Sequence, residues 1–535
     1  MGHDAIVIGA GHNGLAAAAY LARAGLRTLV LERRPLVGGA CVTEEIRPGF
    51  RVSRAAYVAG LLRPALVREL GLESRGLRLL ARSPSSFTPQ PDGAGLLLGP
   101  DPSLCREEIG RFSKRDAARY PAYEAFLDRI ARALEPLFDV SPPTPGRLRT
   151  RDLAPLARAS LRGLRLGGEF SEATALLLGA ARPALERWFE SEPLRSTLAT
   201  DAVIGAWASP SSPGTGYVLF HHVMGETGGA RGVWAYVQGG MGALSDALAR
   251  AASDAGAEIR CDHPVRGVRI EGGRATGVVL GDGTELGAPL VVSNADPKRT
   301  FLGLVGRESL EPDFVRAIEA LDFRSPSMKI NLALDRLPRF PGRTPAAPDP
   351  PRAGPEHAGT IHVGACDLDA LDRCFAEACA GELPTRPMIE LTIPSALDPT
   401  LAPEGRHVAS LFVQPVPDSP EGGWDSRRDG FAARVLALLD EVAPGFSSSV
   451  LACEVLAPPD LERIFALTGG NIFHGAMSLD RLLFMRPLPG WSQYRTPVPG
   501  LWLCGAGTHP GGGVMGACGR NAAGEILRSV GRRRR

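Results

Sequence analysis

The sequence predicts an α/β fold in which a Rossmann-like domain is interleaved with a second domain of α+β structure. Three glycine-rich segments predict it, at residues 4–33, 239–292 and 500–524. Each combines short apolar runs with a glycine loop and a helix-forming stretch, the pattern of a parallel sheet with phosphate-binding turns. Because the segments lie far apart in the chain, we expect one domain to be assembled from all three.

The first segment has the elements of a dinucleotide-binding unit in the expected order. Residues 5–8 (AIVI) are apolar and β-prone, as in a strand covered on both faces. The glycines of a GxGxxG motif follow at Gly9, Gly11 and Gly14, ahead of an alanine-rich helix. Gly9 would permit the tight turn, Gly11 the close approach of a pyrophosphate, and Gly14 the packing of the helix on the sheet. Free N–H groups at the helix start would bind the phosphates.

The residues after the second strand favour FAD over NAD. Glu32 follows this strand, about where the acid that binds a ribose hydroxyl belongs, and we assign Arg33 beside it to the same cofactor site. The doublet Gly38–Gly39 resembles the one that amine-oxidase and phytoene-desaturase flavoproteins carry, where a flexible loop closes on the second phosphate of FAD. Alone, the doublet is also compatible with an ordinary loop.

The middle segment predicts the rest of the adenine half of the site. Residues 239–256 predict a glycine loop followed by an amphipathic helix. A meander follows, with turns at Gly272–Gly273 and Asp282–Gly283, and it ends in a buried strand at 291–292. Resemblance to the same flavoproteins implies that Val265 lies beside the adenine and contacts it through its backbone.

The C-terminal segment predicts the flavin half of the site. A strand at 501–504 is followed by glycines, and a helix is expected to begin at Val514. The helix N-terminus would face the pyrimidine edge of the isoalloxazine and stabilise negative charge in the reduced flavin. The expected contacts are Gly505, Gly513, Val514 and Met515. Related flavoproteins often have an acid after this strand; because glycine stands here, contacts to the ribityl chain are expected from backbone or from Thr508.

Over most of its length the chain resembles the phytoene desaturase-like, amine-oxidase-type flavoproteins, and among them the pyridine nucleotide-disulfide oxidoreductase domain-containing protein 2 family. The resemblance is carried by 469–487 (GGNIFHGAMSLDRLLFMRP) and 501–523 (LWLCGAGTHPGGGVMGACGRNAA), and it is weakest over 100–200 and 338–359. It implies a glutathione-reductase-type FAD-binding domain, FAD as cofactor and an FAD-dependent oxidoreductase activity. It also implies a link to mitochondria, because the animal relative is thought to be a mitochondrial regulator that docks on a respiratory-chain subunit.

Three functions are compatible with these motifs. The first is an enzyme that dehydrogenates a small apolar or amine substrate by hydride transfer to flavin N5, with oxygen, a quinone or another carrier as electron acceptor. The second is a flavin-binding regulatory protein with little turnover. The third is a carotenoid (phytoene-type) desaturase, which would need a long apolar tunnel and membrane docking.

The cysteine pattern excludes the dithiol chemistry of disulfide reductases. Such enzymes carry Cys-x4-Cys after the glycine doublet, but Ile46 stands five residues after Cys41. The other pair at this spacing, Cys374 and Cys379, lies in a predicted helix, where the two sulfurs would point to different faces. No second strand-GxGxxG-helix unit for NAD(P)H is present in the sequence, and no cysteine spacing indicates a metal site.

Lys329 and His474 are the catalytic candidates. Lys329, one of three lysines, alternates with apolar residues in a predicted strand that resembles the amine-oxidase strand whose lysine holds a water near flavin N5. The alternative is the solvated face of an edge strand. His474 and Asn471 lie in the segment before the last strand, which in this class lines the substrate cavity; a packing role is the alternative. The pair His221–His222 favours a structural role over a cavity role.

The predicted domains are discontinuous. The FAD-binding domain would comprise 1–75, 225–300 and 455–535, and the substrate domain 76–224 and 301–454. The proline-rich stretch 337–355 predicts a surface loop or a disordered insert.

Charge and hydropathy bear on partners and location. A net charge of +2 gives no reason to expect nucleic acid. The early first strand leaves no room for a targeting peptide, apolar runs are too short to span a membrane, and scattered cysteines fit a reducing compartment, so a cytoplasmic location is expected. Residues 151–166 alternate leucine with arginine, which indicates an amphipathic helix. It would pack on its own protein or, as the second interpretation, make a peripheral membrane contact.

Overall fold

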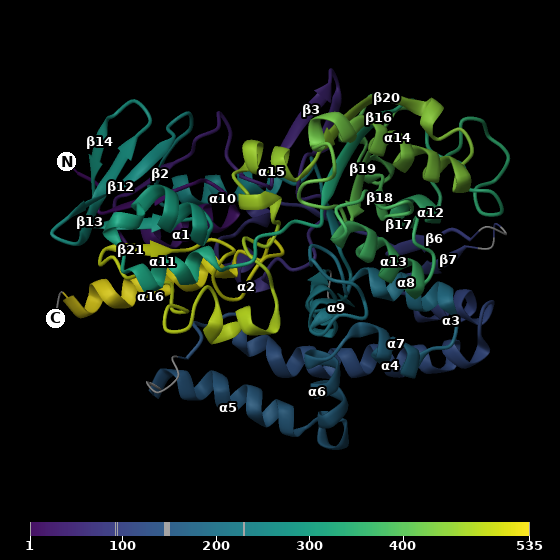
Figure 1. The fold of residues 1–535 in the computed structure, drawn as a ribbon, viewed down its shortest axis with the longest axis horizontal. Helices are drawn as coiled ribbons and strands as arrows, with labels where there is room; N and C mark the ends of the chain where they lie inside the picture. The colour runs from purple at the N-terminus through teal and green to yellow at the C-terminus, as the bar shows by residue number, and fades with distance from the viewer. Residues whose placement is uncertain (1, 91–92, 94, 144–149, 228–229, 534–535) are drawn as a thin grey trace.

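A computed structural model describes residues 2–533 apart from 91–92, 94, 144–149 and 228–229. The molecule is elongated, with one sheet towards each end of its long axis and a group of helices below them in the view of Figure 1. No helix in the described parts of the chain is both long and apolar enough to cross a membrane.

The first sheet is parallel and draws its five strands from both ends and the middle of the chain. In spatial order they are β11 (Glu258–Arg260), β2 (Thr28–Leu31), β1 (Ala5–Ile8), β15 (Leu290–Ser293) and β21 (Leu501–Leu503). Both neighbours of β1 are in register with it, with Ala5 opposite Thr28 on one side and Leu290 on the other. All of these strands except β11, at the edge of the sheet, are buried and mostly apolar because both faces are covered.

Helices cover one face of this sheet and an antiparallel meander covers the other. The helices are α1 (His12–Arg23), α10 (Gly242–Asp254) and α16 (Ala517–Arg533), and α1 packs against the other two. The meander consists of β12 (Val265–Glu271), β13 (Arg274–Leu280) and β14 (Glu285–Gly287). Its two turns fall at Gly272–Gly273 and Asp282–Gly283, which confirms the predicted hairpins.

The second sheet has seven strands. Its order is β20 (Val450–Leu456), β16 (Met328–Leu334), β19 (His407–Gln414), β18 (Met388–Thr392), β17 (Thr360–Val363), β6 (Ser86–Thr88) and β7 (Leu96–Leu98). Apolar side chains on one face pack against α14 (Trp424–Val442). The predicted segments 76–224 and 301–454 supply every strand, except that β20 runs two residues past 454. The domain boundaries themselves stay a prediction.

The helical group consists of α3 (Pro102–Gly110), α4 (Lys114–Leu134), α5 (Thr150–Leu164), α6 (Phe170–Leu178), α7 (Ala181–Trp188), α8 (Glu192–Thr200) and α9 (Thr215–Val223). The remaining strands and helices are β3 (Thr43–Arg47), β4 (Phe50–Ser53), β5 (Leu79–Ala81), β8 (Glu226–Thr227), β9 (Ala230–Arg231), β10 (Ala235–Val237), α2 (Pro64–Glu69), α11 (Pro312–Glu319), α12 (Pro355–Ala358), α13 (Leu368–Cys379) and α15 (Pro458–Phe465). The proline-rich stretch before α12 contains neither helix nor strand, as predicted for a loop, although Phe340 within it is buried.

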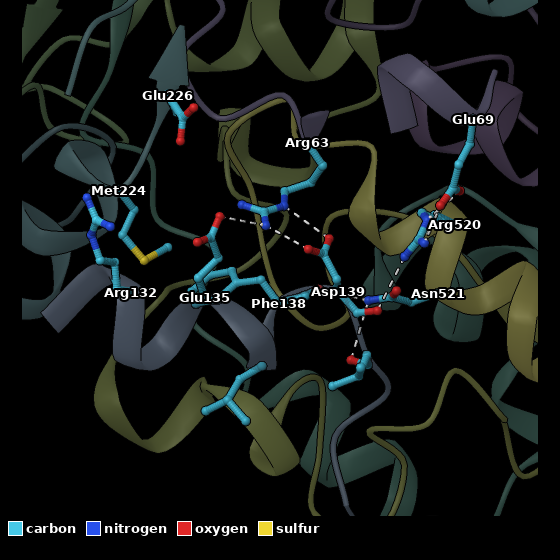
Figure 2. Close-up of polar contacts among 12 residues, drawn as sticks. Arg63, Glu69, Arg132, Glu135, Phe138, Asp139, Met224, Glu226, Arg520 and Asn521 are labelled. Atoms are coloured by element: carbon cyan, nitrogen blue, oxygen red, sulfur yellow. Dashed lines mark hydrogen bonds and ion pairs between the residues drawn. The ribbon is translucent and has the colours of Figure 1, made fainter. Parts of the chain in front are cut away.

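The segment that follows α4 is tied to the start of α2 by ion pairs and to α16 by a hydrogen bond (Figure 2). Arg63, at the start of α2, bonds to Asp139 at 2.6 Å and to Glu135 at 3.2 Å. From α16, Arg520 bonds to Glu69 at 2.6 Å and Asn521 donates to the carbonyl of Phe138 at 3.0 Å. These contacts fix the helical group against α2 and α16.

One predicted boundary is wrong. The sequence predicts that the last helix begins at Val514, but α16 begins at Ala517. Val514 and Gly516 have φ values of 57° and 70°, which lie in the left-handed region and cannot continue into a right-handed helix.

Candidate functional site

The glycine loops from the two ends of the chain meet at Asn294, just after β15. A Cβ placed on Gly11 would lie 2.7 Å from Asn294 Nδ2, and one on Gly505 would lie 2.5 Å from the carbonyl oxygen of Asn294. Helices α1 and α16 also cross closely, since a Cβ on Gly519 would lie 2.1 Å from the carbonyl oxygen of Asn13. The two loops therefore form one continuous surface.

The GxGxxG turn has the geometry that a dinucleotide phosphate needs. Gly9 has a φ of 93°, a conformation that glycine adopts without strain. A Cβ on Gly14 would lie 2.2 Å from the carbonyl oxygen of Gly9, so only glycine lets α1 pack this close to the strand. The N-terminus of α1 follows Gly11 and has no side-chain cap, which leaves its N–H groups available to a phosphate.

Glu32 faces the same turn from the end of β2. Its carboxylate accepts hydrogen bonds from the backbone N–H of Ala10 at 2.8 Å and of Arg34 at 3.0 Å, and its side chain is buried. Two backbone bonds leave further acceptor sites on the oxygens, because a carboxylate offers about four. This arrangement fits an acid that holds a ribose hydroxyl beside the phosphate turn.

The remaining predicted adenine-side residues differ in their positions. Gly38 donates to the carbonyl of Ala10 at 2.8 Å, so the glycine doublet lies directly on the GxGxxG turn. Val265 begins β12, close to Glu32, whose carbonyl accepts from the N–H of His263. Arg33 points elsewhere: it is exposed and donates to the carbonyls of Arg463 and Ile464 at the end of α15. The structure therefore gives Arg33 a partner other than a cofactor.

The C-terminal loop is built from residues in unusual conformations. Gly511 and Gly513 have φ values of 120° and 112°, and Val514 lies in the left-handed region, which is rare for a β-branched residue. Strained backbone of this kind concentrates at ligand sites. Gly513 and Val514 line the main cavity, whereas Met515 is buried among the core side chains of the helical group and does not line it.

A buried arginine holds this loop to the turn that carries His474. Arg486 donates to the carbonyls of Phe473, Ala476 and Ala506 at 2.6, 3.0 and 2.9 Å. Burial lowers the pKa of its guanidinium to about 10, so it stays charged at neutral pH. Asn471 shapes the same turn, because its Oδ1 accepts from the N–H groups of Phe473 and Gly475.

The main cavity, of about 330 Å³, lies between these loops and the seven-stranded sheet. Residues from both glycine-rich ends border it, including Ala40, Cys41, Gly513 and Val514. The opposite wall comes from strands β16, β17, β18 and β19 and from the helices α4, α8 and α9. The cavity therefore connects the predicted flavin loops with the predicted substrate domain.

Lys329 is buried at this cavity. It lies on β16, an interior strand of the sheet, and is 2% exposed, so the alternative of a solvated edge strand is wrong. Its Nζ has no hydrogen-bond partner among the described residues and lies 3.7 Å from the centre of the Tyr57 ring. Burial lowers the pKa of this amine well below its ordinary value, with an opposing effect from the charge of Glu390.

Three ionisable side chains cross the sheet in one row. Lys329 pairs with Phe412, Phe412 with Glu390, and Glu390 with His362, so all four side chains face the cavity from neighbouring strands. Tyr57 lies over this row and donates to Glu390 at 2.6 Å. Burial raises the pKa of Glu390 and, together with the charge of Arg82, lowers that of His362 to about 3.

His474 faces the cavity on the flavin-loop side. It has a φ of 58°, and its buried Nδ1 has no hydrogen-bond partner among the described residues. Burial, followed by the charges of Arg486 and Arg299, lowers the pKa of His474 to about 4. His12, the first residue of α1, lines the cavity nearby, and burial and His474 lower its pKa to about 4 as well. Both imidazoles are therefore neutral at physiological pH.

The paired histidines have separate roles. His221 contacts the carbonyl of Gly512 at 3.2 Å and so supports the C-terminal loop. His222 lines the cavity, although its Nδ1 contacts the carbonyls of Asp201 and Val218. The structural role predicted for the pair holds for both, and His222 adds a surface to the cavity.

The cysteines fit the exclusion of dithiol chemistry. Cys41 is a free, buried thiol whose pKa burial raises to about 12, so it carries no thiolate at neutral pH. Cys374 is buried and Cys379 is exposed, as expected for two faces of α13. All nine cysteines are free.

Glu390, His362 and Tyr57 were missed by the sequence analysis. Two of them could have been recognised from the sequence. Glu390 is the one charged residue in the strand sequence MIELT, and His362 is the one ionisable residue in TIHV. A charged residue in an otherwise apolar interior strand is costly unless it has a function or a partner. Tyr57 lies in an irregular loop, where the sequence gives no comparable signal.

Comparisons with known proteins agree with this geometry. The model of the family "Flavin containing amine oxidoreductase" matches residues 14–345. The chain is 50% identical to pyridine nucleotide-disulfide oxidoreductase domain-containing protein 2 of Rattus norvegicus, over 99% of this chain and 94% of the relative. It is 29% identical to one of the chains of limonene dehydrogenase from Castellaniella defragrans, over 99% and 95% of the two sequences. A solved structure of putrescine oxidase bound to putrescine covers 99% of each chain with a TM-score of 0.62 at 15% identity, a likeness of fold alone.

Proposed function

Because the chain belongs to the family of flavin-containing amine oxidoreductases and is an FAD-dependent oxidoreductase, we propose that it dehydrogenates a compact apolar or amine substrate. One observation carries the proposal. The same cavity is bordered by the glycine loops of both chain ends and, on the opposite wall, by the amine of Lys329, which has no hydrogen-bond partner in the described part of the chain.

The first sheet is proposed to be a glutathione-reductase-type FAD-binding domain. Support comes from its parallel strand order, the meander on one face and the helices on the other. The residues that would hold FAD are Gly9, Gly11, Gly14, Glu32, Gly38, Gly39, Val265, Gly505, Gly513 and Val514. When bound, FAD supplies a hydride acceptor at N5.

Lys329 is proposed to accept the proton that dehydrogenation releases from the substrate. Removal of two hydrogens yields one hydride and one proton, and the proton needs an acceptor on the chain. An amine nitrogen with a free lone pair can take it, and burial favours the neutral form of the Lys329 amine by lowering its pKa. His474, also neutral and unpartnered at Nδ1, is the second candidate for holding or moving a proton.

The size and lining of the cavity support a compact substrate. Ligand cavities have volumes of about 300–1,000 Å³. The volume of this cavity lies near the lower limit, and a bound flavin ring would occupy part of it. Its wall is largely aromatic and aliphatic, with Tyr57, Phe412 and Trp234 among its members. The name of the Castellaniella relative supports an apolar hydrocarbon, and the description of the matching family supports an amine.

The test is anaerobic reduction of the purified, FAD-loaded protein by two panels of compounds, cyclic terpenes and aliphatic amines. Loss of the oxidised flavin absorbance with a member of either panel is expected. Lys329→Met should slow that reduction by about 100-fold, the lower range for a proton-transfer group. Lys114→Met, at the exposed start of α4, should leave the rate unchanged.

Two alternatives are outcomes of the same test. If no compound in either panel bleaches the flavin while the protein keeps full FAD, the result favours a flavin-binding regulatory protein, with a respiratory-chain subunit as its expected partner. If neither panel bleaches the flavin but long polyenes, tried as a third panel, do, the result favours a carotenoid desaturase. A reducing compartment such as the cytoplasm is proposed from the free state of the cysteines.

A further inference from the structure

Exposed apolar side chains gather on two neighbouring helices of the helical group. Of the nine large hydrophobic residues that are exposed in the described chain, five lie within 26 residues, on α5 and α6. They are Leu153, Leu161, Leu164, Phe170 and Leu178, with exposed fractions from 53% to 75%. Figure 1 shows α5 and α6 at the edge of the molecule, away from both sheets.

The apolar side chains form a stripe along α5. Leu153, Ala157, Leu161 and Leu164 follow one another at spacings of four, four and three residues, which places them on one face of the helix. The side of α5 that faces the protein packs against α4 and uses other residues, such as the half-buried Leu156. The interpretation that the leucines of 151–166 pack on their own protein is therefore wrong for Leu153, Leu161 and Leu164.

An arginine row runs beside the leucine stripe. Arg158, Arg162 and Arg165 repeat the spacing of four and three residues and are all exposed. Residues 151–166 contain four arginines against one aspartate, a net charge of +3. Arg162 also donates to the carbonyl of Arg132 on α4 at 2.9 Å, which keeps the row next to the helix it packs on.

The arginine row borders a hollow that adjoins the main cavity. This hollow is bordered by residues of α4, α5 and β9 and is lined by arginines and by the carboxylates of Glu135 and Glu226. The arginines are Arg129, Arg132, Arg162, Arg165 and Arg231. Arg231 also lines the main cavity, together with Asp128 of α4, to which it bonds at 2.8 Å. The side chain of Arg231 therefore borders both the hollow and the main cavity.

We propose that α5 and α6 dock this protein on the surface of a bilayer that contains anionic phospholipids. A helix with an apolar stripe beside a cationic one lies in the plane of such a surface, with its apolar side chains among the acyl chains and its arginines at the head groups. An apolar substrate would then reach the cavity from the bilayer past Arg231; this second part rests on the proposed function.

The test is flotation of the purified full chain with vesicles of phosphatidylcholine alone or mixed with phosphatidylglycerol. The wild-type chain is expected to float with the mixed vesicles and to bind the neutral ones at least about tenfold more weakly, because each arginine near an anionic surface contributes to binding. Leu161→Glu combined with Leu164→Glu should reduce binding to the mixed vesicles about tenfold or more.

The matched control is Leu79→Glu, which changes an exposed leucine on β5 and should bind like wild type. FAD content and melting temperature show that each variant is folded, so a docking failure is separate from a failure of the flavin assignment. The proposal is overturned if wild type does not float, or if the double variant floats as well as wild type. It is also overturned if the chain forms a dimer through the leucine stripe in buffer without vesicles and this dimer persists when vesicles are added.

Discussion

At the scale of single residues, the site depends on ionisable side chains that the fold buries beside the main cavity. Lys329 could be singled out from the sequence because it interrupts an apolar strand in a chain with three lysines. Its burial could not be predicted, because the same alternation fits an edge strand and an interior one. The pairing of β16 with both β19 and β20 decides between them. Glu390 and His362 face the same cavity through cross-strand register, which depends on contacts between distant segments.

Replacing Lys329 by methionine is predicted to stabilise the protein at neutral pH. The pKa of Lys329 is lower in the folded chain than in the unfolded chain, so unfolding takes up a proton at every pH between the two values. Lys329 therefore lowers the stability of the wild-type chain as pH falls through that range. Methionine fills similar space with no amine to protonate, and a gain of about 1–2 kcal/mol is expected.

Chemical denaturation of wild type and Lys329→Met across the alkaline to neutral range measures this effect. The advantage of the variant should grow as pH falls from alkaline values towards neutrality. A variant that is less stable at neutral pH, or an advantage that does not change with pH, would show that the amine is charged or partnered in the folded protein.

At the scale of elements, two irregular segments carry much of the candidate site. The turn at 471–476 and the loop at 505–516 contain no long helix or strand, and Arg486 joins them through backbone carbonyls. The sequence predicted the glycines of the second loop but placed the start of the last helix at Val514. Gly513, Val514 and Gly516 have positive φ values, so the helix cannot begin before Ala517. A positive φ could not be predicted for Val514, because valine rarely adopts it.

Arg486→Gln is predicted to destabilise both segments. Glutamine has two N–H donors against the five of arginine, so buried carbonyls of Phe473, Ala476 or Ala506 would lose their donors. The free energy of unfolding should fall by about 2–3 kcal/mol, and FAD should bind more weakly. Thermal melting with and without added FAD checks both effects; unchanged FAD binding would mean that the turn and the loop do not need this connection.

Arg63→Ala is predicted to loosen the segment after α4 while leaving the sheets intact. Removal of Arg63 leaves Asp139 and Glu135 without the guanidinium that bonds to both (Figure 2). A half-buried ion pair broken at one partner costs about 1–3 kcal/mol. Hydrogen exchange should become faster in 135–140 and α5 but not in β1 or β16. Arg307→Ala, which breaks an exposed pair with Glu319, serves as the comparison and should have little effect.

At the scale of the whole molecule, the structure brings together segments from opposite ends of the chain. The parallel sheet could be predicted from three local motifs, because each motif contains its own strand, glycine loop and helix. The strand order of the seven-stranded sheet could not be predicted in this way, because nothing in the sequence of each strand indicates which strands lie beside it. The cavity lies between the glycine loops and the seven-stranded sheet, which explains why the cofactor loops were predicted more completely than the opposite wall.

The account depends most on the meeting of the two glycine loops at Asn294, where Gly11 and Gly505 both lie against the same residue. The direct measurement is the amount of FAD bound per chain after purification for wild type, Gly11→Val, Gly505→Val and the control Gly430→Ala, whose added methyl group meets open space on α14. We predict a yellow wild type and control with a full complement of FAD, and folded but nearly colourless variants at both loops. A wild-type chain that stays colourless with added FAD, or a loop variant that keeps full FAD, would contradict a shared dinucleotide site.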